Sequence, residues 1–139
     1  MQTLLTRDEC RLVQASFAEI EPIAHDVAAM FYGRLFELNP GLRPLFKSDM
    51  KQQGVQLMEK LAVAVHGLEA PESIAPLVGA LGRRHGGYGV TPADYDTACE
   101  ALLWSFSEAM GAAFSSELRA AWRAAFQTLS VEMIRVAEP

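Results

Sequence analysis

The sequence predicts an all-α fold, and three observations support this. Apolar residues recur at three- and four-residue spacing along almost the whole chain, which is typical of amphipathic helices packed on a common core. No stretch shows the alternation expected of a strand. Proline, glycine and N-cap residues separate the periodic segments. With 139 residues and no internal repeat, low-complexity tract or long linker, residues 1–139 are expected to form a single domain.

The first helix is predicted to begin at Thr6, because Thr6 and Glu9 have the spacing of a capping box. Its inward face carries Leu12, Val13, Phe17 and Ile20. Proline is tolerated in a first turn, so a second helix is predicted over residues 22–38. Its apolar face carries Val27, Phe31, Leu35 and Leu38, with Tyr32 beside them.

A short helical turn is expected after Asn39-Pro40, through Leu42 and Leu45 to Phe46. Ser48 and Asp49 then lead into a long helix. The inner face of this helix carries Gly54, Leu57, Met58, Leu61, Val65 and Leu68.

Residues 72–86 form the next predicted helix, with Leu77, Leu81 and His85 on one stripe and a glycine-rich segment ending it. Thr91 as N-cap and Pro92 at the first position begin a further helix. Its inner face holds Cys99, Leu102, Leu103, Phe106 and Met110. Ser115 is expected to cap the last helix. That helix presents Leu118, Trp122, Phe126, Leu129, Met133 and Val136.

Composition argues against several functional classes. Twelve basic against seventeen acidic residues give a net charge of −5 without a basic block, so nucleic acid is not an expected partner. No uncharged apolar run approaches the roughly 18 residues that span a bilayer, and the first residues lack signal-peptide features. We therefore expect a soluble, cytoplasmic protein. Cys10 and Cys99 lack Cys-x-x-Cys spacing and are expected to be reduced structural thiols.

The three histidines, His25, His66 and His85, form no pair with the spacing of a zinc or di-iron site on one helix. Hydrolase and nucleotide-binding motifs are also absent, since the segment GRRHGGYG ends a helix instead of following a strand. Two interpretations of His85 fit its spacing: a core histidine with its polar atoms satisfied, or a ligand.

Several motifs in this order resemble the globins. They are Phe31-Tyr32 on the second helix, Pro44-Leu45-Phe46 after it, and His85 ending a helix before a glycine loop. The chain resembles in particular the bacterial single-domain globins, which are similar to the haem part of flavohaemoglobins, in MFYGRLFELNPGLRPLFKSD, QLMEKLAVAV, LGRRHGGYGV and AAWRAAF. The resemblance spans nearly the whole chain. It implies a three-over-three helical sandwich around haem b, with His85 at the proximal position.

This resemblance gives His85 the role of the iron ligand and leaves the sixth iron position open for a diatomic gas such as O2, NO or CO. Leu81 is expected to touch the cofactor one turn before His85. Phe46 matches the haem-stacking phenylalanine, although an ordinary core aromatic fits its spacing equally well. The guanidinium of Arg84 is the preferred partner for a haem propionate; Arg83 and Lys51 are alternatives, and a solvated position is open for all three.

On the distal side, Tyr32 matches the family's oxygen-binding tyrosine, and the alternative is a core tyrosine bonded to a carbonyl. Gln53 is preferred to Gln52 for the second polar role, because it stands four residues before Leu57 on the buried face. A solvated position of Gln53 remains the alternative. Leu57 then matches the apolar residue over the iron.

His66 comes 13 residues after Gln53, too far along the helix to coordinate the same iron. A haem held by two histidines is therefore not expected. The spacing of His25 predicts a position on the outer, solvated face of its helix.

The resemblance implies two functions: reversible oxygen binding, or oxidation of nitric oxide to nitrate. In flavohaemoglobin-like globins a tyrosine and a carboxylate hold the proximal histidine and strengthen its donation to iron. Tyr95 matches that tyrosine, but Ala137 falls at the carboxylate position and Glu138 is rotated by about 100° from it. Turnover would also need a separate reductase. Oxygen binding is therefore preferred; a haem-free sensor or interaction domain is the third alternative.

Overall fold

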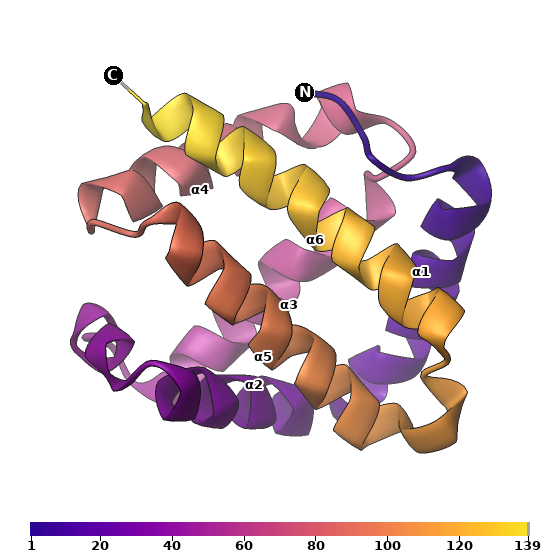
Figure 1. The fold of residues 1–139 in the computed structure, drawn as a ribbon, viewed down its shortest axis with the longest axis horizontal. Helices are drawn as coiled ribbons and strands as arrows, with labels where there is room; N and C mark the ends of the chain where they lie inside the picture. The colour runs from indigo at the N-terminus through magenta and orange to yellow at the C-terminus, as the bar shows by residue number, and fades with distance from the viewer. Residues whose placement is uncertain (139) are drawn as a thin grey trace.

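The structure, a computed structural model, describes residues 1–138, and six α-helices form this part of the chain (Figure 1). They are α1 (Arg7–Ile20), α2 (Ala24–Leu38), α3 (Met50–His66), α4 (Pro71–Gly87), α5 (Pro92–Met110) and α6 (Ser116–Ala137). The 3₁₀ segments are η1 (Glu21–Ile23), η2 (Pro40–Leu45) and η3 (Gly111–Ala113). Residues 1–138 contain no strand, and the prediction of an all-α fold is confirmed.

The N-caps predicted from sequence are found in the structure. The Thr6 hydroxyl accepts a hydrogen bond from the backbone N–H of Glu9, and the Glu9 carboxylate accepts one from the N–H of Thr6. Thr91 caps α5 in the same reciprocal way with Asp94, and the Ser115 hydroxyl accepts from the N–H of Leu118. These bonds satisfy N–H groups that have no partner within the helix.

Three details of the predicted helices were wrong. Residues 21–23 form a 3₁₀ turn, so α2 begins at Ala24 and not at Pro22, whose ring fixes φ and removes a backbone donor. Leu38, expected on the buried face, is 44% exposed because α2 ends there. The third α-helix ends at His66, so the buried Leu68 belongs to the turn that follows it.

Helix α6 connects the two ends of the fold, since it packs on α1, α4 and α5. Figure 1 shows α5 and α6 running diagonally in front of α3. Helix α2 packs on both α3 and α5, whereas α4 is held mainly by α6 and contacts α3 only slightly. Helix α4 therefore depends on α6, and not on α3, for most of its packing.

Glycines allow the closest helix contacts. A Cβ atom on Gly82 of α4 would lie 2.6 Å from the backbone of Met133 on α6, which no real side chain tolerates. A Cβ atom on Gly54 of α3 would lie 3.1 Å from the Cβ atom of Ala28 on α2. These two contacts fix how near α4 lies to α6 and how near α3 lies to α2.

The main core is built around Trp122, which is 1% exposed. Its ring lies 4.5 Å from that of Phe106 and 6.2 Å from that of Phe17, measured between ring centroids. Its indole N–H donates a 2.8 Å hydrogen bond to the hydroxyl of Ser16, so burial leaves this donor satisfied. The free thiols of Cys10 and Cys99 are also buried, and burial raises the pKa of Cys99 to about 11.

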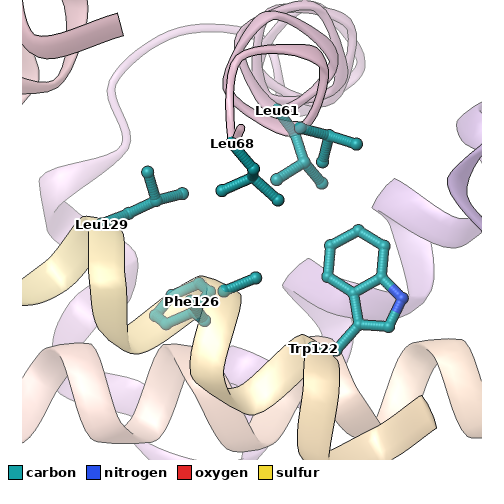
Figure 2. Close-up of a pocket in the computed structure, with 7 residues that line it drawn as sticks. Leu61, Leu68, Trp122, Phe126 and Leu129 are labelled. Carbon is teal, nitrogen blue, oxygen red and sulfur yellow. The ribbon is translucent and has the colours of Figure 1, made fainter. Parts of the chain in front are cut away.

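A small cavity of about 10 Å³ lies between α6 and the end of α3 (Figure 2). It is lined by Leu61, Val65, Leu68, Trp122, Ala125, Phe126 and Leu129. Figure 2 shows the side chains of Leu61 and Leu68 facing those of Trp122 and Leu129 across it. The lining is apolar and offers a water molecule little room and no hydrogen-bond partners, so the cavity is a packing defect and not a ligand site.

Within residues 1–138, no helix is both long and apolar enough to cross a membrane.

Candidate functional site

The turn between α4 and α5 brings His85 and Tyr95 together. The backbone N–H of Val90 donates to the carbonyl of His85 at 3.0 Å, and Gly89 adopts a φ of +79°, which glycine reaches without strain. Thr91 then caps α5, so Tyr95 lies in the first turns of that helix. The Nδ1 atom of His85 lies 3.2 Å from the hydroxyl oxygen of Tyr95.

His85 is half-buried, and its environment favours a neutral imidazole. Burial lowers the pKa of His85, and the positive charges of Lys60 and Arg84 lower it further. When the proton is on Nδ1, the ring donates to the Tyr95 oxygen and Nε2 carries a free lone pair. That is the form in which a histidine binds a metal ion.

An aromatic cluster surrounds Tyr32 on α2. The Tyr32 ring centroid lies 4.9 Å from that of Phe31, 6.1 Å from that of Phe36 and 5.3 Å from that of Phe46. Tyr32 is 8% exposed, and within residues 1–138 its hydroxyl makes no hydrogen bond to protein. Burial raises the pKa of Tyr32 to about 12, so the phenol remains a hydrogen-bond donor at neutral pH.

The face of α3 next to its buried stripe carries Gln53 and Leu57, both half-buried, while Gln52 is exposed. The preference for Gln53 from helical spacing is thus consistent with its burial, and its role stays a prediction. Lys60 is half-buried on the same face and close enough to affect the pKa of His85. Lys60 stands four residues after the exposed Gln56 and eight after the exposed Gln52, so helical spacing points to the solvated face and could not have found this position.

On α4, Leu81 is half-buried one turn before His85, and Phe46 is half-buried at the end of η2. The side chains of Arg83, Arg84 and Lys51 are exposed, and none of them is in an ion pair within residues 1–138. The guanidinium of Arg83 folds back along α4, within 3.4 Å of the place where a Cβ on Gly79 would lie. Arg84, in contrast, acts electrostatically on His85.

The C-terminal end of α6 lies against α4 beside His85. A Cβ atom on Gly86 would lie 2.8 Å from the Cβ atom of Ala137, so Ala137 is next to the residue that follows His85. Ala137 and Glu138 are both exposed. The Nδ1 atom of His85 is bonded to Tyr95 and, within residues 1–138, to no carboxylate.

The remaining histidines lie elsewhere. His66 is exposed at the C-terminal end of α3, and His25 is exposed in the first turn of α2. Residues 1–138 contain no group of three or more His, Cys, Asp and Glu side chains that could hold a metal ion. Within these residues, His85 is thus the only histidine that is not exposed.

These residues fit a haem. Leu57, Leu81 and Phe46 are apolar side chains that protein covers only in part. A flat apolar group would cover the rest of their surface, and His85 offers the neutral nitrogen that haem iron prefers. Lys60 and Arg84 place positive charge near His85.

The relatives found among known proteins are flavohemoproteins of bacteria. The flavohemoprotein of Rhizobium meliloti is 29% identical over 131 residues, which cover 91% of this chain and 32% of that protein. The flavohemoprotein of Deinococcus radiodurans is 28% identical over 137 residues, covering 96% of this chain and 34% of that protein. The chain thus spans about a third of the length of these relatives.

Solved structures show the same fold. A flavohemoglobin from Malassezia yamatoensis with bound FAD and haem superposes with a TM-score of 0.81 at 19% identity, covering 96% of this chain and 36% of that one. An engineered carbene transferase from Rhodothermus marinus superposes with a TM-score of 0.83 at 24% identity, covering 91% and 89%. Residues 29–133 match the Globin family. The chain therefore belongs to the globin family and has the globin fold predicted from its sequence.

Proposed function

We propose that this globin holds haem b through His85 and binds oxygen reversibly. The observation that carries the proposal is the 3.2 Å contact between Nδ1 of His85 and the hydroxyl of Tyr95, because it leaves Nε2 as the free ring nitrogen. Membership of the globin family makes haem the cofactor of choice. When bound, the haem supplies an iron with one open position for a diatomic gas.

The chain's own residues then perform separate tasks. Tyr95 orients the His85 ring and fixes its tautomer, as outer partners of metal-binding histidines do. The partly covered apolar side chains of Leu57, Leu81 and Phe46 exclude water from the haem faces. Lys60 and Arg84, whose positive charges act on His85, would pair with the haem carboxylates. Arg83 and Lys51 are the weaker candidates for that role.

Tyr32 is the residue proposed to retain oxygen. Its hydroxyl is protonated at neutral pH and has no protein partner within residues 1–138, so it is free to donate a hydrogen bond to a bound gas. Gln53 is proposed as the second polar group, from the neighbouring face of α3. CO and NO would occupy the same position, with less benefit from a hydrogen-bond donor for CO because it carries less negative charge.

Oxygen release from the purified haem protein tests this proposal. Replacing Tyr32 by Phe removes the donor and is expected to accelerate oxygen dissociation on the order of tenfold or more. Tyr88→Phe is the matched control, since it also removes one phenol hydroxyl and the Tyr88 side chain is 57% exposed. If Tyr32→Phe and Tyr88→Phe both released oxygen at the wild-type rate, the proposed role of Tyr32 would be wrong.

Nitric oxide dioxygenation with a separate reductase is the second candidate. The His85–Tyr95 contact favours it, because the sequence resemblance implies such a tyrosine in flavohaemoglobin-like globins. The small side chain of Ala137 beside α4 argues against it, since within residues 1–138 no carboxylate is bonded to His85 to strengthen its donation. Mixing the oxygenated protein with nitric oxide and a reductant decides between the two: slow or single-turnover nitrate formation supports oxygen binding, and sustained turnover supports the dioxygenase.

The variant Ala137→Glu tests whether a carboxylate near His85 favours the dioxygenase reaction. A carboxylate at this position would stand beside Gly86, near the His85–Tyr95 pair, and should raise nitrate formation several-fold. Ala137→Gln has the same shape without the charge and is the control. Equal rates in the two variants would show that a proximal carboxylate does not limit the reaction in this chain.

A further inference from the structure

The outer side of helices α2 and α5 carries an arginine stacked on a tryptophan. The two helices pack against each other (Figure 1). The guanidinium carbon of Arg34 on α2 lies 5.2 Å from the centroid of the Trp104 ring on α5, and Trp104 is half-buried. The electron-rich face of an indole ring attracts a cation placed over it. The pair therefore gives this surface an ordered centre.

Arg34 has hydrogen-bonding capacity that the chain itself does not use. Its Nη1 atom lies 3.3 Å from Oε2 of Glu37, in an exposed ion pair of a kind that contributes little to stability. Its Nε atom is buried and, within residues 1–138, has no hydrogen-bond partner. Because a buried donor without an acceptor is unfavourable, this edge of the guanidinium calls for a partner. Guanidinium groups bind carboxylates through two parallel hydrogen bonds, so a carboxylate from another molecule would suit it.

Apolar side chains flank this pair on α2. Met30 stands one turn before Arg34 and Leu38 one turn after it, on the same side of the helix. Met30 is half-buried, and Leu38 is 44% exposed. Tryptophan, arginine and methionine are enriched in the centres of protein–protein interfaces. The composition of this surface is thus that of an interface.

The same surface carries a carboxylate that is free to pair. Glu108 stands one turn after Trp104 on α5, is exposed and forms no ion pair within residues 1–138. Glu100, one turn before Trp104, is already paired with Arg123 of α6 at 2.6 Å. The surface therefore holds both an arginine that lacks an acceptor and a carboxylate that lacks a cation.

These two groups make the surface complementary to itself. A twofold axis midway between two groups exchanges them, so an axis between Arg34 and Glu108 places each Arg34 beside the Glu108 of a second copy. The 15 residues of α2 and the 19 of α5 give helices about 22 Å and 28 Å long. Two adjacent helices of this length offer enough area for the roughly 800 Å² that each partner buries in a stable interface.

We propose that two copies of this chain associate through the surface formed by Met30, Arg34 and Leu38 of α2 with Trp104 and Glu108 of α5. In this dimer, Arg34 of each copy pairs with Glu108 of the other. No residue assigned to haem or oxygen belongs to this surface, so the inference goes beyond gas binding and does not depend on it.

Sedimentation velocity of the purified, haem-loaded protein over about a hundredfold range of concentration tests the proposal, since a reversible dimer dissociates on dilution. The wild type is expected to form a dimer at the upper end of this range. Arg34→Glu and Glu108→Arg each bring like charges together at both symmetric contacts, and each should weaken association about tenfold or more. Glu59→Arg, at an exposed and unpaired carboxylate on α3, is the matched control and should dimerise like the wild type.

An equimolar mixture of Arg34→Glu and Glu108→Arg gives the sharpest test. In a mixed dimer the two substituted positions face each other with opposite charges, and the remaining Arg34 faces the remaining Glu108. The mixture is therefore expected to associate about as strongly as the wild type, although each variant alone does not. A residue with only a structural role in its own chain would not show this recovery.

Three results would overturn the proposal. They are a wild type that stays monomeric at every concentration, a charge variant that dimerises as strongly as the wild type, and a mixture that associates no better than its components. Circular dichroism of each variant verifies that the fold is retained. If Arg34→Glu fails to fold, Glu108→Arg and Leu38→Ser carry the test at exposed positions, and undiminished association in both would overturn the proposal.

Discussion

The Nδ1 atom of His85 lies 3.2 Å from the hydroxyl oxygen of Tyr95, and this contact joins the end of α4 to the beginning of α5. It gives the imidazole a fixed orientation and leaves one nitrogen free. His85 and Tyr95 are ten positions apart in the sequence. The turn between α4 and α5, which ends at the cap Thr91, sets the distance between their side chains.

Tyr95→Phe should loosen this orientation while leaving the fold intact, because only one hydroxyl is removed. Haem affinity is expected to fall by about tenfold, as for other outer partners of metal-binding histidines. The iron–histidine stretching frequency in resonance Raman spectra of the ferrous protein should also fall, since Nδ1–H loses its acceptor. Tyr88→Phe is the control. If the iron–histidine stretching frequency of Tyr95→Phe equalled that of the wild type, the hydroxyl of Tyr95 would have no effect on His85.

Gly82→Ala should destabilise the protein, because the added Cβ would lie 2.6 Å from the backbone of Met133. We expect the free energy of unfolding to fall by about 1–3 kcal/mol. Gly33→Ala is the matched comparison, because Gly33 is also in a helix interior but a Cβ atom there would meet nothing within 4 Å. This variant should raise the free energy of unfolding by about 0.5–1 kcal/mol. Urea unfolding of both variants in the same haem state measures the difference. Equal stabilities would contradict the close α4–α6 contact.

The pH dependence of Tyr32 follows from its burial, which raises its pKa to about 12. An exposed tyrosine titrates near about pH 10. The folded protein therefore prefers the neutral phenol, and the associated stability is present below about pH 10 and is lost as the pH rises toward 12.

Ultraviolet titration of tyrosinate measures this directly. Burial also raises the pKa of Tyr95, so two tyrosines titrate late in the folded protein. Tyr32→Phe should remove the component at about pH 12 and leave that of Tyr95. Oxygen dissociation should be independent of pH between neutrality and about pH 10. A dissociation rate that rises in this range in the wild type but not in Tyr32→Phe would show that Tyr32 loses its proton earlier.

Much of the fold could be predicted from sequence, because helix periodicity and caps are local. Thr6, Thr91 and Ser115 act as the caps that their spacing indicated. The 3₁₀ turn at Pro22 was missed, since proline at a first helical position is compatible with either helix type.

Less of the candidate site than of the fold could be predicted from the sequence. The closeness of Lys60 to His85 depends on how α3 and α4 face each other, which periodicity does not give. A groove of about 470 Å³ beside Tyr32 lies where α2, η2 and α3 meet. Both features come from the relative placement of helices and not from any one segment.

The ligand role of His85 is the central claim, and the absorption spectrum of the purified protein tests it most directly. The wild type should contain one haem per chain and show an intense Soret band that shifts when CO is added. His85→Ala should lose the ferrous spectrum of a histidine-ligated haem, whereas His66→Ala, at an exposed position, should retain it. A His85→Ala variant with the same ferrous spectrum as the wild type would contradict the account.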